Sequence, residues 1–234
     1  MAMIAAVINY SGNVGKSMVA RHLLAPRMGD ASVISIESIN ADDNDGPTMR
    51  GREFGSLQER LLALDDAVVD IGASNVEDLV NRMKSYSGSH EDFDMFVVPT
   101  VPDAKQERDT LATIKALSDE IGIERDRIRV VLNMVDPRDA LRSKFASLFA
   151  FHDEHRGFIL REEAAIHENE LFGKLANSPI TIGDLLADTT DYKAMIRDAK
   201  SPEEKTELAR KVAMRRLAVG VNAQLDGVFA ALMR

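Results

Sequence analysis

Short apolar runs alternate with segments of helical spacing along the first 137 residues. The apolar runs predict strands at 3–9, 31–36, 67–71, 95–100 and 128–133. Between them, apolar positions recur at helical spacing and predict helices at 15–24, 57–64, 76–84 and 107–121. This alternation is typical of an α/β fold with a mostly parallel sheet flanked by helices.

The rest of the chain predicts a loop and a helical extension. Residues 39–51 are rich in Asp, Asn, Gly and Pro, which indicates a loop that could close over a ligand. Beyond Pro137 the pattern is helical, including 162–176 and the last thirty or so residues, with one short apolar run at 178–182. We expect a single domain over 1–234, with a core at 1–137 and a helical part at 138–234.

Composition narrows the classes of protein. The chain has 234 residues, 45% of them hydrophobic, and no cysteine, which excludes disulfides and thiolate metal sites and suits a reducing cytoplasm. The net charge of -9 argues against a surface that attracts nucleic acid everywhere, although it permits a local basic patch. The opening run MAMIAAVIN predicts a buried strand rather than a signal peptide, and no apolar stretch is long enough to span a bilayer.

A phosphate-binding motif stands between the first predicted strand and the first predicted helix. It consists of Ser11, Gly12, Asn13, Val14, Gly15, Lys16 and Ser17, followed by Met18. Glycines let successive backbone amides turn toward phosphate oxygens, and the helix amino terminus adds partial positive charge. Lys16 would contact the outer phosphates, and the Ser17 hydroxyl would bind Mg²⁺. The motif predicts a nucleoside triphosphate, with ATP preferred.

The motif departs from the common P-loop pattern, because Tyr10 stands where that pattern has its first glycine. It resembles the variant loop of ParA and MinD type ATPases, K-G-G-x-G-K-[ST], at Gly12 and at 14–17. Ser11 replaces the family's signature lysine, which in that family reaches the phosphates of a partner subunit, and Asn13 replaces its second glycine. The resemblance implies a nucleotide-dependent dimer, but the serine puts dimer-dependent catalysis in doubt.

Two further segments resemble motifs of the same family. The run AVVDIGAS at 67–74 resembles the Walker B strand, which implies that Asp70 holds Mg²⁺ through water. The run VVLNMVDP at 130–137 resembles the strand whose asparagine recognises adenine, which implies that role for Asn133. Because Asp136 follows in an N-x-x-D pattern similar to the guanine-reading N-K-x-D, GTP stays an alternative to ATP.

The segment after the second strand departs from the family pattern. Ile39 falls where the family has the aspartate implicated in hydrolysis. Either Glu37, Asp42 or Asp43 substitutes as the acid that positions water, or hydrolysis is slow. Each of these acids can equally be a solvated loop charge. We therefore expect a slow ATPase, with Lys16, Glu37 and Asp42 as candidate catalytic residues, or a binding module that scarcely hydrolyses its nucleotide.

The resemblance also implies a cellular role. The combination of AVVDIGAS, the helical tail and the altered signature looks closest to the StbB and TraL type proteins of conjugative plasmids. It implies a bacterial cytoplasmic protein, associated with the nucleoid or with a plasmid-encoded DNA-binding adaptor, that acts in plasmid positioning, partition or conjugative transfer.

The tail offers a candidate DNA-facing segment. Its basic residues are Lys193, Arg197, Lys200, Lys205, Arg210, Lys211, Arg215 and Arg216. Non-specific DNA binding neutralises phosphates with such residues, although a solvated helix face is the commoner explanation. Apolar residues of the same tail recur at helical spacing, which predicts core packing rather than a membrane-binding helix.

Overall fold

The computed structural model describes residues 3–36, 48–49, 54–176 and 178–234. It divides into two compact units, one made of Met1–Glu168 with Gly227–Arg234 and the other of Asn169–Asp226. The helix α10 (Pro202–Met233) contributes to both units. Whether the chain behaves as the single domain expected from its sequence stays a prediction.

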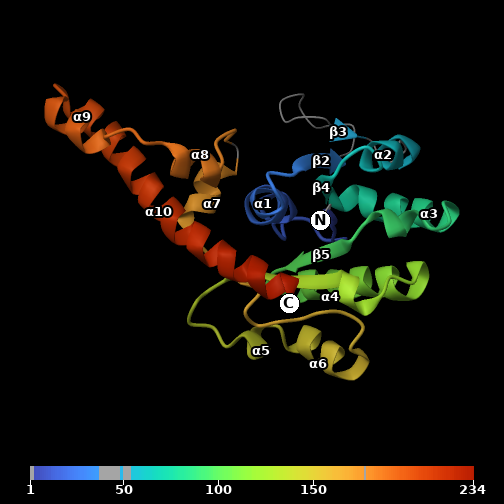
Figure 1. Cartoon of the computed structure of the whole chain (residues 1–234). Coiled ribbons are helices and arrows are strands. Elements are labelled where there is room, and N and C mark those ends of the chain that lie inside the picture. Colours follow the sequence, from blue (N-terminus) through green and yellow to red (C-terminus); the bar gives the residue numbers. More distant parts are fainter. Residues whose placement is uncertain (1–2, 37–47, 50–53, 177) are drawn as a thin grey trace. The chain divides into compact units, whose positions relative to one another are not determined.

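The first unit is built on a parallel sheet (Figure 1). Its strands are β1 (Met3–Val7), β2 (Ser32–Ile36), β3 (Thr48–Met49), β4 (Asp66–Ile71), β5 (Met95–Thr100), β6 (Ile128–Val135) and β7 (Ala165–His167). They lie in the order β3-β2-β4-β1-β5-β6-β7, and every pair of neighbours is parallel. The predicted fold class is therefore confirmed, because parallel neighbours require the helical crossovers that the sequence pattern indicated.

Successive side chains of a strand point to opposite faces of the sheet, and helices cover these faces. They are α2 (Phe54–Leu61), α3 (Val76–Ser85), α4 (Ala104–Lys115) continued by η6 (Ala116–Ile121), α5 (Leu141–Lys144) and α6 (Ala146–His155). Ala6, Val69 and Val130 pack with α2, α3, α4 and α6 in one apolar core. Ala5 and Val68, on the opposite face, are also fully buried, as both faces of a parallel sheet must be.

Two short strands correct the sequence interpretation. Ala165–His167 lies in a segment predicted to be helical, yet it forms β7 and pairs with β6. Thr48–Met49 lies in the predicted loop, yet it pairs with Ser35 and Ile36 of β2. Both pieces are too short for a period of two to be recognised, and only pairing with a neighbouring strand stabilises them.

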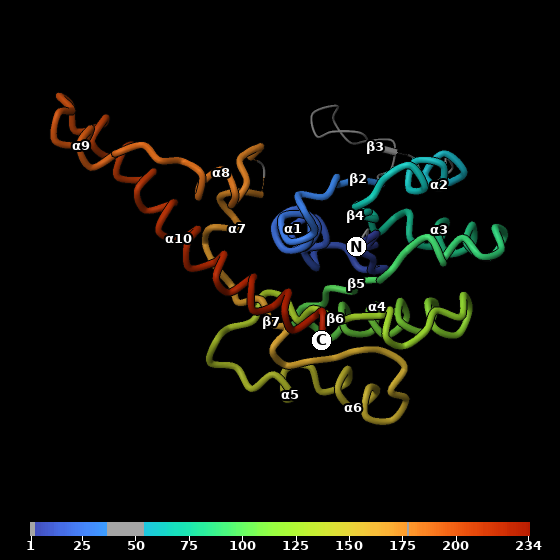
Figure 2. The backbone as a smooth tube through the Cα atoms, viewed as in Figure 1, coloured from blue at the N-terminus to red at the C-terminus, as the bar shows by residue number. Residues whose placement is uncertain are grey.

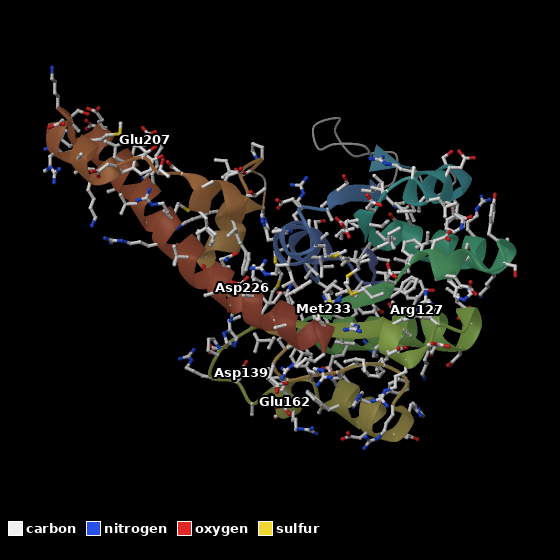
Figure 3. All side chains as sticks on the ribbon, in the orientation of Figure 1. Arg127, Asp139, Glu162, Glu207, Asp226 and Met233 are labelled. Carbon is white, nitrogen blue, oxygen red and sulfur yellow. The ribbon has the colours of Figure 1, made fainter. Side chains whose placement is uncertain are left out.

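The first unit also contains ion pairs near α5 and a contact between β6 and the C-terminal residues. Arg142 of α5 donates to Glu162 at 2.8 Å and Lys144 pairs with Asp139 at 3.2 Å, in the region of the two labelled acids (Figure 3). At the other end of the chain, the Arg129 guanidinium of β6 donates to the Leu232 carbonyl. The C-terminus accordingly lies beside β6 and β7 (Figure 2).

The second unit is helical, as predicted for most of this region. It contains α7 (Glu170–Leu175), α8 (Ile182–Ala187), α9 (Tyr192–Asp198) and most of α10. Thr181 and Asp184 form a reciprocal capping box at the start of α8. Buried residues of α10 recur at Leu208, Ala218, Val221 and Leu225, so the apolar stripe packs inward as expected. No helix in the described ranges combines the length and apolar character that crossing a membrane requires.

Candidate functional site

The predicted phosphate loop connects β1 to the first helix. That helix starts as α1 (Lys16–Met18) and continues as η1 (Val19–Leu24) and η2 (Ala25–Arg27). Gly12, Asn13 and Ser17 are exposed, and the amides of a helix's first turn have no partner within the helix. The loop and these amides lie at the carboxyl end of β1, where α/β proteins bind ligands.

The backbone of the loop explains its departure from the family pattern. Asn13 has a φ of 59° and Gly15 a φ of 84°, so both are left-handed. Asparagine is one of the few residues with a side chain that adopts this conformation readily. Asn13 can therefore replace a glycine without changing the path of the loop.

Lys16 is folded into the loop. Its Nζ donates to the Ser11 carbonyl at 2.6 Å and to the Asn9 carbonyl at 3.2 Å, and the residue is 9% exposed. Burial lowers the pKa of Lys16, and the nearby Asp70 carboxylate partly opposes this change. The lysine is held as a charged donor at the loop, in a position suited to an anionic ligand.

Asn9 supports the loop through buried hydrogen bonds, a role that we did not predict from the sequence. Its Oδ1 accepts from the Ser11 amide at 2.7 Å, while its Nδ2 donates to the Pro99 carbonyl at 2.9 Å and to Thr110 Oγ1 at 2.8 Å. Thr113, one turn after Thr110 on α4, accepts from the Tyr10 amide at 3.0 Å. A signal was present in the sequence, since a lone asparagine ends an otherwise apolar strand.

Asn133 lies behind the loop rather than apart from it. It is 1% exposed, and its Nδ2 donates to the Val14 carbonyl at 2.9 Å. A Cβ on Gly15 would lie 2.2 Å from this nitrogen, so only glycine fits there. The structure thus brings Asn133 together with the loop, and its predicted contact with adenine stays a prediction.

Asp70 and Ser17 are the candidate Mg²⁺ ligands. Asp70 is near the end of β4, paired with Val7 of β1, and is 6% exposed. Ser17 is exposed on α1, which contacts β4. Hard oxygen donors of this kind fit Mg²⁺, which keeps most of its ligands as water and phosphate oxygens. The described residues contain no cluster of three or more His, Asp or Glu that could hold a metal without a phosphate ligand.

Ser11 is buried, with 3% of its surface exposed. Its amide donates to Asn9 and its carbonyl accepts from Lys16. Both contacts are made by the backbone, so the position that carries the family's signature lysine holds here a short, buried side chain. Met18, which follows the motif, is partly exposed on α1, and its predicted contact with the nucleotide stays a prediction.

Asp136 is already engaged near the end of β6. Its Oδ1 accepts from the amide and from Nε of Arg138, each at 2.9 Å, and Oδ2 pairs with Nη2 at 2.5 Å. These hydrogen bonds hold the pKa of Asp136 well below its usual range. A guanine ring would have to compete with Arg138 for this carboxylate.

The remaining candidate acids follow β2 in the sequence. Glu37, Ile39, Asp42 and Asp43 lie outside the described residues. The carbonyl of Ile36, which directly precedes them, accepts from the Gly72 amide at 2.9 Å and from Asn75 Nδ2 at 3.2 Å. The end of β2 is thus attached to the loop that follows Asp70.

Comparisons with known proteins agree with this geometry at the level of the fold. No protein-family model and no curated protein sequence matches the chain. Among solved structures, pnob8 ParA matches with a TM-score of 0.50 at 12% identity, covering 92% of this chain and 99% of its own. MinD of Aquifex aeolicus matches with a TM-score of 0.49 at 14% identity, covering 94% and 98%.

A third structure is a candidate plasmid partition protein of Borrelia burgdorferi bound to AMPPNP. It matches with a TM-score of 0.48 at 14% identity, covering 89% of this chain and 98% of its own. These structural neighbours are ParA and MinD type proteins, as the sequence motifs implied. The chain has the α/β fold of the ParA structure, and its predicted phosphate loop connects β1 to α1.

Proposed function

We propose that the protein binds ATP with Mg²⁺ at the loop 11–17 and acts as a slow ATPase or nucleotide switch of the ParA and MinD type. The single observation that carries this proposal is the preformed loop, in which Lys16 is held at 2.6 Å from the Ser11 carbonyl beside Asp70. Bound Mg²⁺ would neutralise charge on the phosphates, held by Ser17 directly and by Asp70 through water.

ATP is favoured over GTP by the engagement of Asp136. Guanine reading requires a free carboxylate that accepts from two ring donors, and both oxygens of Asp136 accept from Arg138. Asn133, with a donor and an acceptor on one amide, suits the adenine edge. The nitrogen of that amide donates to the Val14 carbonyl, so Asn133 would have to release or share this hydrogen bond in order to contact adenine.

The cellular role proposed is the positioning of a plasmid or of its transfer machinery, as in StbB and TraL type proteins. The partners would be a second copy of this chain and a plasmid-encoded DNA-binding adaptor. Neighbouring acids and an internal contact make the basic segment of α9 and α10 less suited to direct DNA contact. Four exposed acids lie among its cations: Asp198, Glu203, Glu204 and Glu207. Arg215 is also used internally, since it donates to the Asp188 carbonyl at 2.8 Å.

A binding module that retains ATP is the second candidate, and buried Ser11 favours it. Nothing at this position supplies charge to a partner's phosphates, a contribution comparable to an arginine finger in trans. Phosphate release should be measured in single turnover for wild type and Ser11→Lys across a series of protein concentrations. A slow ATPase that pairs in the family's manner predicts faster release in the variant, growing with concentration.

The control for this experiment is ATP affinity, measured on both proteins. If Ser11→Lys binds ATP as the wild type does and releases no phosphate faster at any concentration, the chain does not pair in the family's manner or Ile39 is a second defect. If adding Ile39→Asp also leaves the variant inactive while ATP stays bound, the binding module replaces the ATPase. Rapid hydrolysis by the wild type alone would contradict both proposals, because it would require a catalytic acid and charge that neither assumes.

A further inference from the structure

Exposed large apolar side chains are few in the described part of the first unit. They are Leu62 at 75% exposure, Tyr86 at 43% and Met134 at 43%. Leu62 lies between α2 and β4, and Tyr86 follows α3, so both lie in connections that lead to amino ends of strands. Met134 instead lies at the carboxyl end of β6. It is therefore the only one of the three at the edge of the sheet that carries the phosphate loop.

The backbone turns Met134 outward. Its φ is 54°, a conformation that residues with a Cβ seldom adopt. The pairing of β6 with β7 is irregular between Leu132 and Val135, and Val135 is again buried at 1% exposure. The pairing of β5 with β6 ends at Leu132, so Met134 lies beyond the end of that neighbouring strand. A left-handed residue that exposes an apolar side chain costs stability, and such residues cluster at ligand sites.

Met134 follows directly in the sequence a residue that contacts the loop. The residue before it, Asn133, donates to the Val14 carbonyl at 2.9 Å. The Cα of Gly15 is so near that a Cβ on it would lie 2.2 Å from Asn133 Nδ2. Met134 is therefore one residue away from a side chain that contacts the phosphate-binding backbone.

We infer that Met134 is a nucleobase-contacting residue, whose thioether packs against the flat face of the purine of a bound nucleoside triphosphate. This inference rests on the proposed function and names the residue that recognises the base. A purine has polar edges but apolar faces, so it needs an apolar surface close to its phosphate site. Methionine adapts its shape to such a ring, and its sulfur makes favourable contacts with aromatic groups.

The test distinguishes the contribution of the base to binding from that of the phosphates. Isothermal titration calorimetry with Mg²⁺ present would compare ATP with inorganic tripolyphosphate, which lacks the base and ribose. Met134→Asn removes the apolar side chain while keeping a residue that tolerates a positive φ. Met134→Leu keeps an apolar side chain of similar size at the same conformation. Leu62→Asn is the matched control, since it removes an exposed apolar side chain at the opposite edge of the sheet.

We expect Met134→Asn to weaken ATP binding about five-fold, as the loss of a partly buried apolar contact implies. Its tripolyphosphate affinity should stay within about two-fold of wild type, because the phosphate site is intact. Leu62→Asn should bind both ligands as wild type does. Met134→Leu should stay within about three-fold of wild type for ATP, because it keeps the apolar surface and loses only the sulfur contact. Urea unfolding should show Met134→Asn to be no less stable than wild type, since asparagine suits the backbone better.

Two results would overturn the inference while leaving ATP binding in place. In one, Met134→Asn binds ATP as tightly as wild type. In the other, it loses ATP and tripolyphosphate to the same extent, which would make Met134 a support of the loop and not a contact of the base. If wild type binds neither ligand, the proposed function itself fails, and that result is distinct from both.

Discussion

His22 lies in η1, in the second turn after the phosphate loop, and should make the protein sensitive to acid. The residue is 8% exposed, and its Nδ1 has no hydrogen-bond partner. Burial, with a smaller effect of Arg21, lowers the pKa of His22 from 6.5 to about 4. The folded protein therefore keeps the ring neutral down to about pH 4, whereas the unfolded chain protonates it near pH 6.5.

The sign and size of the effect follow from linkage. Between pH 6.5 and about 4, the unfolded chain binds a proton at His22 that the folded chain does not, so stability falls as the pH falls through this range. The gap in pKa of about 2.5 corresponds to about 3 kcal/mol in all, at 1.36 kcal/mol for each pH unit. Between pH 7.5 and pH 5 the loss should be about 2 kcal/mol.

The perturbation is His22→Leu, which keeps a buried side chain and removes the titrating ring. Urea unfolding followed by circular dichroism would give the free energy of unfolding of wild type and variant at pH 7.5 and pH 5. Wild type should lose about 2 kcal/mol more than the variant over this interval. Comparing the two proteins cancels the pH-dependent contributions of other groups. One of these is Glu107, whose pKa is raised by burial, so that its effect on stability changes with pH in the opposite direction.

His155→Leu is the control, because His155 is exposed. It makes the same histidine-to-leucine change at an exposed position, and should leave the free energy of unfolding at pH 7.5 close to that of wild type. If His22→Leu loses as much stability between pH 7.5 and pH 5 as wild type does, then His22 is protonated in the folded protein and the reasoning from burial is wrong.

Three further changes test other parts of the structure. Gly15→Ala places a Cβ 2.2 Å from Asn133 Nδ2 at a φ of 84°, so it should abolish ATP binding and lower the melting temperature; unchanged binding in a calorimetric titration would show that the loop can relax. Glu107 accepts a hydrogen bond from the Leu148 amide at 3.3 Å, and burial raises its pKa. The protonated side chain therefore contributes stability below pH 4.5, and this contribution is lost as the pH rises through the folded pKa. Glu107→Gln should remove that loss in urea unfolding at pH 4.5 and pH 8, and an unchanged difference would refute it. Arg138→Ala removes the side-chain hydrogen bonds to the Asp136 carboxylate and keeps the one from the backbone amide, so it should raise GTP affinity relative to ATP in a competition assay; a constant ratio would remove Asp136 from base selection.

The sequence predicted the sheet, most helices and the loop because each has a strong local signal. A buried parallel strand is a continuous apolar run, and the loop stands in the setting that its chemistry requires. Asn13 looked like a departure from the motif, yet its left-handed φ of 59° makes it equivalent to the glycine it replaces. The sequence pattern did not show this equivalence, because it depends on the backbone conformation of Asn13 and not on the chemistry of its side chain.

Features that depend on distant partners were not predicted. β7 is three residues long and exists because β6 offers a free edge. Asn9 forms hydrogen bonds with residues some ninety to one hundred positions away, at Pro99 and Thr110. The same holds for Asn133, whose partner Val14 is 119 positions earlier. No spacing rule links residues so far apart in the chain.

The central claim is that the loop binds a nucleoside triphosphate through Lys16, and calorimetric titration of ATP with Mg²⁺ tests it most directly. Wild type should bind one ATP for each chain. Lys16→Ala removes a charged donor that makes two hydrogen bonds in the loop, and it should weaken affinity by about 100-fold, or about 3 kcal/mol. Circular dichroism should show that the variant is folded. A folded Lys16→Ala protein that binds ATP as tightly as wild type, or a wild type that binds no ATP, would contradict the account.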